Sequence, residues 1–469
     1  MILDRDLTVL FATAEFGPWV KVGGLGEAST GLVSSLQAMG AEVVVVLPDY
    51  GGIELADETR FSLPNLPWWC PEIRARRGRV GDDLDVVLLA FPNSRRPHPY
   101  VNPATGTAWP DASDFFFTFS AGVAALAALE GSDLVHLNDW HTATALAHLP
   151  NESATVLTVH NLAYQGVDGV RWLRLCGDRS SPFVHNGDFN PLAGGIRLAD
   201  RVVLVSESYR KEAVQETGGF GLHQLLADRG TDLSGIRNGI DLGLWNPADD
   251  PHLPVNYRHD DLSGKEICRK ELLRLAGLEA GRGPVIGMVA RLVEQKGVDL
   301  ALDIVPFLRS VSARMVLIGS GCPSLAAQAV AVAERYPDHF VAWCEYDDDL
   351  AHLVVAGSDL LLMPSRFEPC GLTQLQAMTC GTIPVVTAVG GLCDTVIDTD
   401  SNPRRGTGFV ARKPDALAIL DALHRACRGW GNPRRRAAVQ RRGMTADWSW
   451  SKPARRYLKL YRSLAAETG

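Results

Sequence analysis

The sequence lacks the patterns that mark disulfide-rich, membrane-spanning or cysteine-based metal proteins. Its nine cysteines are scattered and form no Cys-x-x-Cys pair, so we expect reduced thiols and no cysteine metal site. The longest apolar run, Ala121–Leu129, is much shorter than the roughly 20 residues needed to cross a bilayer. No low-complexity segment and no short internal repeat is visible. These absences predict an ordinary globular protein.

The charge balance argues against two further classes of partner. The formal net charge is −8 at pH 7, which disfavours binding to nucleic acid and to anionic membranes. Residues Met1–Asp6 carry acids where a secretory signal carries basic residues before an apolar core. We therefore expect a cytoplasmic protein with no nucleic-acid or membrane partner, and the oligomeric state stays open. A chain of 469 residues exceeds the usual size of one core, so two or three domains are expected.

Two series of short apolar runs alternate with helical stretches along the chain. The runs predicted as strands in the first half are Leu7–Ala14, Ala41–Pro48, Leu84–Phe91, Leu134–Asn138, Val156–His160 and Arg201–Val205. Those in the second half are Pro284–Val289, Met315–Ile318, Phe340–Trp343, Leu360–Met363 and Ile383–Val386. Between them, the polar residues 60–113 predict only loops and short hairpins.

This alternation predicts an α/β protein built from two doubly wound parallel sheets. Turn residues at Asn238–Asp241 mark the crossover, so the expected domains are 1–240 and 241–469. Amphipathic helices are predicted at Asp114–Leu129 and Ala454–Leu464. In such folds ligands bind at the carboxyl ends of the strands, and the two domains are expected to face each other across a deep cleft.

Two glycine-containing turns follow predicted strands, and both favour an anion site. Lys21 precedes Gly23 and Gly24, and a lysine beside free backbone amides suits a phosphate. A bare turn with a surface lysine is the alternative. The second turn begins after Met363, contains Glu368, and reaches a helix start at Cys370, Gly371, Leu372 and Thr373. A carboxylate beside an anion site is expected to bind ligand hydroxyls.

Seven motifs together carry a family resemblance. They are Lys21–Gly26, His136–His141, Thr158–Gly166, Asn238–Asp241, Arg291–Gly297, Ser365–Gln374 and Gly406–Phe409. In this order they resemble the bacterial glycogen synthases and plant starch synthases, the retaining GT-B enzymes of glycosyltransferase family 5. The resemblance implies a terminal helix that packs back on the first domain. It also implies transfer of glucose from a nucleotide diphosphate, most simply ADP-glucose, to the 4-hydroxyl of an α-1,4-glucan, without a cofactor.

The chemistry of a sugar–diphosphate donor fits a pair of cations. Arg291 and Lys296 follow the end of one predicted strand, so both can face one diphosphate, the arginine through its fork and the lysine as a point charge. Two such contacts can stabilise the leaving group without a metal ion. Asp347–Asp349 is predicted to begin a helix, where acids are favourable with the helix dipole, rather than to bind metal.

The resemblance assigns further roles residue by residue. His160 and Asn161 match the His-Asn pair near the reacting sugar, and Asp139 matches the acid in the cleft, for which a helix N-cap is the alternative. Glu368 would fix the register of the donor sugar, and Tyr346 would lie against the base. No covalent intermediate is expected: the acceptor attacks on the front face, and the departing phosphate takes the proton.

Several positions depart from the family pattern. Gln376 and Cys380 stand where tyrosines are usual, Thr387 where an arginine is usual, and Cys322 where an acid is usual. With Asn161, we take Gln376 and Thr387 as candidate acceptor and specificity residues. The departures leave two alternatives open: a pseudo-glycosyltransferase that couples a nucleotide-activated cyclitol of valienol type to an amino sugar, and a catalytically inactive sugar- or nucleotide-binding protein.

Overall fold

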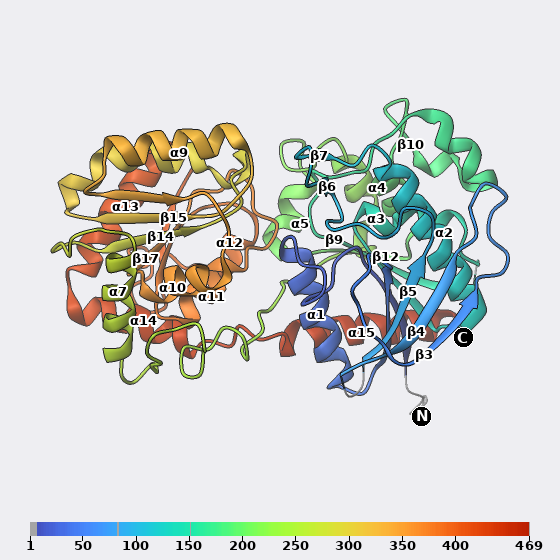
Figure 1. The fold of residues 1–469 in the computed structure, drawn as a ribbon, viewed down its shortest axis with the longest axis horizontal. Coiled ribbons are helices and arrows are strands. Elements are labelled where there is room, and N and C mark those ends of the chain that lie inside the picture. Colours follow the sequence, from blue (N-terminus) through green and yellow to red (C-terminus); the bar gives the residue numbers. More distant parts are fainter. Residues whose placement is uncertain (1–6, 82–83, 151, 469) are drawn as a thin grey trace. The chain divides into compact units, whose positions relative to one another are not determined.

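The computed structural model describes residues 7–81, 84–150 and 152–468 (Figure 1). It divides into two compact units. Unit 1 contains the residues up to Gly239 together with those from Trp450 onward, and unit 2 is Ile240–Ser449. Each unit has its own sheet and its own core.

Unit 1 is built on a nine-stranded sheet of order β13-β12-β9-β8-β1-β2-β5-β4-β3. In chain order its strands are β1 (Thr8–Ala12), β2 (Glu42–Pro48), β3 (Ala56–Ser62), β4 (Arg74–Val80), β5 (Leu84–Ala90), β8 (Leu134–Asn138), β9 (Ala154–Val159), β12 (Arg201–Leu204) and β13 (Leu233–Gly235). The helices are α1 (Gly24–Gln37), α2 (Ala112–Glu130), α3 (Trp140–Ala143), α4 (Pro191–Leu198), α5 (Glu207–Ala213), α6 (His223–Asp228) and α15 (Ser451–Thr468). Two small hairpins, β6–β7 (Val101–Asn102, Thr107–Ala108) and β10–β11 (Val184–His185, Asp188–Phe189), complete it.

The six strands predicted in this half are present, but three expectations are corrected. A short strand of three residues, β13, follows Arg201–Val205, the final strand that the sequence predicted for this half. Residues 60–113 contain β4, which pairs antiparallel with both β3 and β5 and extends the sheet. Its arginines are neutralised by acids, as in Arg77 with Asp85 and Glu130. An arginine-rich strand of this kind gives no apolar signal in the sequence.

The third correction concerns α2, which is not amphipathic. Every residue from Phe115 to Ala127 is buried, because the helix has apolar or small side chains all round. By length and composition α2 could cross a membrane, but 72% of its most apolar window is buried inside the protein. We therefore interpret it as a core helix of unit 1.

Helix α15 belongs to the core of unit 1. Its residues Ala454, Tyr457 and Tyr461 are buried in one cluster with side chains of β1 and α1. The Tyr461 hydroxyl lies 2.5 Å from Nδ1 of His136 in β8. The helix predicted at Ala454–Leu464 is therefore present, longer by several residues, and anchored by a buried polar contact.

Unit 2 contains a parallel six-stranded sheet of order β16-β15-β14-β17-β18-β19. The strands are β14 (Val285–Val289), β15 (Arg314–Ile318), β16 (Phe340–Trp343), β17 (Leu360–Met363), β18 (Ile383–Thr387) and β19 (Phe409–Ala411). The helices are α7 (Ser263–Leu275), α8 (Val298–Ile304), α9 (Pro323–Arg335), α10 (Asp348–Gly357), α11 (Thr373–Thr379), α12 (Gly390–Thr395), α13 (Ala416–Trp430) and α14 (Pro433–Thr445). The five strands predicted in this half are confirmed.

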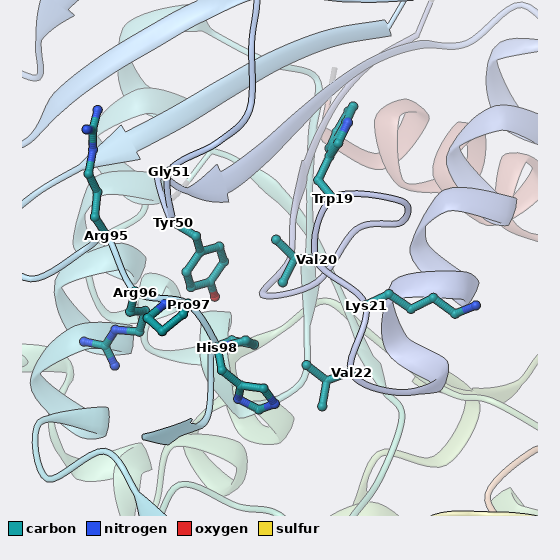
Figure 2. Close-up of a pocket in the computed structure, with 11 residues that line it drawn as sticks. Trp19, Val20, Lys21, Val22, Tyr50, Gly51, Arg95, Arg96, Pro97 and His98 are labelled. Carbon is teal, nitrogen blue, oxygen red and sulfur yellow. The ribbon is translucent and has the colours of Figure 1, made fainter. Parts of the chain in front are cut away.

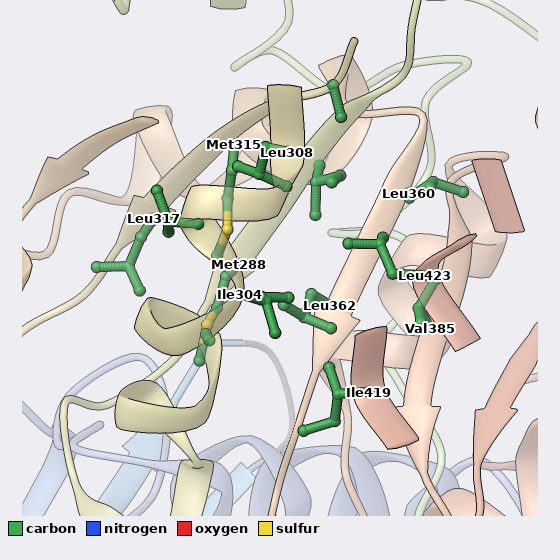
Figure 3. Packing of buried hydrophobic residues seen from close by; sticks show 14 of the residues in the cluster. Met288, Ile304, Leu308, Met315, Leu317, Leu360, Leu362, Val385, Ile419 and Leu423 are labelled. Atoms are coloured by element: carbon green, nitrogen blue, oxygen red, sulfur yellow. The ribbon is translucent and has the colours of Figure 1, made fainter. Parts of the chain in front are cut away.

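Alternation of side chains along the strands gives unit 2 a core on each face of the sheet. Met288, Leu360 and Leu362 point to one face, where Figure 3 shows them packed against Ile304 of α8 and Leu423 of α13. The intervening residues, such as Leu361 and Met363, pack with α7, α10 and α11 on the other face. Because both faces are covered, the strands are apolar throughout, which is why their sequence signal is strong.

Candidate active site

The loop that follows β17 brings Glu368 to Lys296. The Lys296 Nζ lies 2.6 Å from Oε2 of Glu368, and the two side chains are 20% and 5% exposed. The Ser365 hydroxyl donates to the same oxygen at 3.0 Å. Within the residues that the structure describes, Oε1 of Glu368 accepts no hydrogen bond. The carboxylate is therefore held through one oxygen, and the other can accept a hydrogen bond from a ligand hydroxyl.

Tight backbone packing fixes this pair. Gly297 has φ of 65°, and a Cβ placed on it would lie 2.1 Å from the carbonyl oxygen of Pro364. Only glycine fits there, because a side chain would be strained and would also clash. The turn after Lys296 therefore lies directly against the start of the Glu368 loop. Thr387, at the end of β18, supports the loop by donating to the carbonyl of Ser365 at 2.6 Å.

Arg291 lies two residues beyond β14, on the same connection as Lys296. The residue is exposed, and it makes no ion pair with any part of the chain that the structure describes. Lys296 has three donor hydrogens, of which one faces Glu368. The connection after β14 thus offers an unpaired guanidinium and a lysine with spare donors, which suits an anion with several oxygens.

The helix start predicted beside Glu368 is α11. Gly371 has φ of 71° and turns the chain into the helix. The side-chain amide of Gln374 stabilises this turn by donating to the carbonyls of Cys370 and Gly371. The first N–H groups of a helix have no acceptor within it, so Leu372 and Thr373 can offer backbone donors. Cys370 is buried, so we do not assign a ligand contact to its thiol.

Two candidate specificity residues lie in the core rather than on the surface. Thr387 is 0% exposed and Gln376 is 6% exposed. Thr387 acts on the loop through the carbonyl of Ser365. Because the side chain is buried and its hydroxyl donates within the protein, the role that we expect for Thr387 becomes support of the loop.

Tyr346 lies just before α10, with 51% of its surface exposed. Its hydroxyl donates to Asp348 at 3.0 Å, and Asp347 caps the helix by accepting from the amide of Leu350 at 2.8 Å. The prediction that these acids begin a helix is confirmed. The ring of Tyr346 is therefore exposed at the start of α10, and its hydroxyl is held by that helix.

In unit 1, Asp139 and His160 are neighbours. Oδ1 of Asp139 accepts from the backbone amides of His160 at 2.7 Å and Asn161 at 3.4 Å. Asp139 stands at the N-cap position of α3, as the alternative expected, but its side chain makes no capping hydrogen bond to the helix. Its φ of 55° is uncommon for a residue with a side chain, and such strain clusters at functional positions.

Burial sets the charges in this pair. Desolvation raises the pKa of Asp139 to about 7, although the two amide hydrogen bonds act to lower it. Desolvation also lowers the pKa of His160 to about 3, so the imidazole is neutral at pH 7. Asn138 donates through Nδ2 to Ala12, so its Oδ1 accepts from Nε2 of His160 at 3.0 Å. That tautomer leaves Nδ1 of His160 as an acceptor.

The glycine turn after Lys21 is held by a residue that the sequence analysis missed. Glu15 is 3% exposed, and its Oε2 accepts from the amides of Val22 at 2.7 Å and Gly23 at 3.0 Å. The amide of Gly23 is therefore already bonded, and the predicted phosphate cradle is reduced to Lys21 and the start of α1 at Gly24. The available signal was an acidic residue a few positions before Lys21, at the end of the predicted strand.

A pocket of about 500 Å³ lies beside this turn. Figure 2 shows Trp19, Tyr50 and His98 around it, with the Lys21 side chain extending away from Tyr50 and His98. Arg95 and Arg96 complete its polar lining. Aromatic rings with nearby hydrogen-bond donors suit a sugar, which needs an apolar surface and polar partners together. Sequence analysis missed the pocket, because its walls come from segments far apart in the chain.

Two family models and several curated proteins match this chain. The family model of the starch synthase catalytic domain matches residues 8–228, and that of glycosyl transferases group 1 matches residues 270–442. The glycogen synthase of Dechloromonas aromatica is 37% identical, with 98% of this chain and 99% of that protein covered. The glycogen synthase of Halorhodospira halophila is 39% identical, with coverage of 99% and 100%.

Solved structures agree with the sequence comparison. The catalytic domain of starch synthase IV from Arabidopsis thaliana, bound to ADP and acarbose, superposes with a TM-score of 0.87 at 30% identity. The match covers 98% of this chain and 100% of that one. A sucrose-phosphate synthase from Thermosynechococcus elongatus, at 19% identity and a TM-score of 0.65, shares the fold alone.

Proposed function

Because this chain belongs to the glycogen and starch synthase family of glycosyltransferases, we propose that it transfers glucose from ADP-glucose to the 4-hydroxyl of an α-1,4-glucan. The family resemblance and the GT-B α/β fold that the motifs predicted are confirmed. Glucosyl transfer of the glycogen-synthase type follows from relatives that match along nearly the whole chain. The pseudo-glycosyltransferase alternative is not favoured by these relatives.

The contact between Lys296 and Glu368 is the observation that supports the donor site most directly. Cleavage of a sugar–diphosphate bond develops negative charge on the diphosphate, and Lys296 with Arg291 would stabilise it. Glu368, 2.6 Å from that lysine, would accept hydrogen bonds from the glucose hydroxyls and so orient the ring. Backbone amides at Gly371–Thr373 would hold the distal phosphate, and Tyr346 would stack against the base.

The residues of unit 1 are assigned to the sugar and the acceptor. Neutral His160 would accept a hydrogen bond from a sugar hydroxyl through Nδ1, while Asp139 positions it by holding its backbone amide. Asn161 lies next to this pair. The pocket at Trp19 would bind glucose units of the growing chain, since an aromatic ring provides the surface on which a sugar stacks.

The reaction needs no group beyond these residues and the two substrates. The acceptor hydroxyl forms a bond to the anomeric carbon on the face from which the diphosphate leaves, and the anomeric carbon–phosphate oxygen bond breaks. The departing diphosphate takes the proton of the attacking hydroxyl, so configuration is retained. We propose no cofactor and no catalytic metal ion, and we assign the enzyme to the cytoplasm.

The choice of adenine nucleotide and glucan rests on relatives. The starch synthase IV structure contains ADP and acarbose, and the curated relatives are glycogen synthases. The ADP in that structure favours ADP over other nucleotides, and the glycogen synthase relatives favour an α-glucan over a small pseudosugar.

The test is direct. Pure protein is incubated with maltoheptaose and either ADP-glucose or UDP-glucose, and nucleotide release is measured together with the lengths of the products. Extension by single glucose units, faster with ADP-glucose, is expected. Faster turnover of UDP-glucose would overturn the donor assignment. Nucleotide release without extension would overturn the acceptor assignment, and binding without release would support the inactive-protein alternative.

A further inference from the structure

Four ionisable side chains gather in unit 2 outside the proposed donor site. Asp250 and His252 lie on the segment between Ile240 and α7, while His352 and Asp349 lie on α10. One possible ligand atom from each of Asp250, His252 and His352 lies within 4.8 Å of the others. The segment and the helix are far apart in sequence, so only folding brings these groups together.

The cluster consists of two short imidazole–carboxylate contacts. His352 Nδ1 lies 2.7 Å from Oδ2 of Asp250, and His252 Nδ1 lies 2.5 Å from Oδ1 of Asp349. The two imidazole rings are 4.5 Å apart between centroids. Asp250 and His352 are 2% and 3% exposed, whereas the His252 side chain is 29% exposed. The cluster is thus buried on one side and open to solvent through His252.

Hydrogen bonding alone explains each contact but not why the contacts lie together. Each histidine needs only one carboxylate to satisfy one ring nitrogen. The two imidazole rings, with centroids 4.5 Å apart, and the Asp250 carboxylate bring three possible ligand atoms into one small volume. A divalent cation explains this arrangement, because imidazole nitrogens and carboxylate oxygens can share one ion as ligands.

The ligand set indicates the class of cation. Two imidazoles and one carboxylate are typical of zinc and other divalent first-row transition metals, whereas calcium and magnesium prefer oxygen ligands. Ligand atoms about 2.0–2.2 Å from a tetrahedral ion lie roughly 3.4 Å apart. Binding therefore requires the widest pair to close from a separation of up to 4.8 Å and the 2.7 Å contact between His352 and Asp250 to open. Asp349 can serve as a further ligand, or as the carboxylate that orients His252.

We propose that Asp250, His252 and His352 form a site for a zinc-class divalent ion. The ion joins the segment after the crossover to the first turns of α10. The stacking of Trp245 on His352, with centroids 3.9 Å apart and planes at 12°, holds one ligand rigidly in place. The inference concerns the binding of the ion and does not depend on the proposed glucosyl transfer.

The experiment measures metal binding to the full-length protein. Metal-free protein is dialysed against Zn²⁺ or Co²⁺, and the bound metal is quantified. The variants are His252→Ala, whose partly exposed side chain can be removed with little damage to the core, and His259→Ala as the matched control. His259 is an exposed histidine on the same segment that contacts Asp260 at 3.6 Å and lies outside the cluster.

We expect one tightly bound ion in the wild type and in His259→Ala, and binding weaker by at least about tenfold in His252→Ala. Asp349→Asn is expected to weaken binding roughly 10- to 100-fold, as loss of an orienting carboxylate does. Bound Co²⁺ should give visible absorption bands, and excess Mg²⁺ should not displace it. Equal Zn²⁺ binding by the wild type and His252→Ala, or no binding by a wild type that melts cooperatively, would overturn the proposal.

Discussion

Replacing Lys296 by alanine separates the catalytic role of the lysine from its structural role. The lysine lies 2.6 Å from Glu368, whose side chain is 5% exposed. Removing one partner of a fully buried pair costs about 3–5 kcal/mol. Lys296 is 20% exposed, so solvent screens part of the loss, and we expect the unfolding free energy to fall by about 1–3 kcal/mol.

The expected effect on turnover is larger. A charge pair at about 4 Å and an effective dielectric near 20 contributes about 4 kcal/mol. Loss of this stabilisation at the departing diphosphate corresponds to about a thousandfold decrease in kcat. The double variant Lys296→Met/Glu368→Gln removes both charges, so its stability should return towards that of the wild type while its turnover stays low.

Two assays read these effects independently. Urea unfolding gives the stability of each variant, and ADP release from ADP-glucose with maltoheptaose gives its turnover. Arg274→Ala is the control. It breaks an ion pair with Glu271 on α7 in which the arginine side chain is 67% exposed, so solvent screens the pair and the unfolding free energy should stay almost unchanged. Wild-type turnover in Lys296→Ala, or recovery of activity in the double variant, would refute the assigned role.

Three further predictions follow from single features of the structure. Gly297→Ala should destabilise the protein more than Gly277→Ala. The two glycines have nearly the same φ (65° and 64°), but a Cβ would meet backbone atoms only at Gly297. Equal urea midpoints for the two variants would contradict this prediction. The pKa of Asp139 is raised to about 7 in the folded protein, compared with about 3.9 in an unfolded chain. Between these two pH values the folded state keeps a proton that the unfolded state loses. This group therefore makes the unfolding free energy fall as pH rises from about 4 to about 7. Asp139→Asn should remove that contribution in urea titrations, and an unchanged pH profile would reject it. Trp19→Ala should raise KM for maltoheptaose several-fold with little change in KM for ADP-glucose, whereas Trp68→Ala, at a residue 86% exposed and outside the pocket lining, should change neither.

Prediction succeeded where the signal is local. The strands β14 and β17 are apolar along their whole length because both faces are covered, and each was located within a residue or two. It failed on the amphipathic character of α2, because small residues such as Ser120 and Gly122 resemble a polar face in the sequence but are buried in the structure. It failed also at β4, whose arginines are paired with acids. This strand has only a few buried side chains, so its sequence lacks the apolar pattern of a strand.

For the candidate site, the sequence supplied the residues but not their contacts. Glu368 and Lys296 were both chosen, yet they are 72 positions apart. Their contact exists because β17 lies directly beside β14 in the sheet. The same limit explains why Glu15 was omitted: its carboxylate accepts hydrogen bonds from backbone amides that the motif alone leaves without an acceptor. It also explains why Thr387, which is buried, was assigned to a surface that contacts a ligand.

The sequence by itself determined the alternating strands and helices, the two sheets and the motifs with their chemistry, because these depend on side chains a few residues apart. Only the tertiary structure decided which groups meet: the lysine with the glutamate, the neutral imidazole with the strained aspartate, and the two histidines with their carboxylates. The physical reason is that strand order and packing bring distant segments together. Charges, pKa values and metal affinity depend on that proximity, which no local pattern encodes.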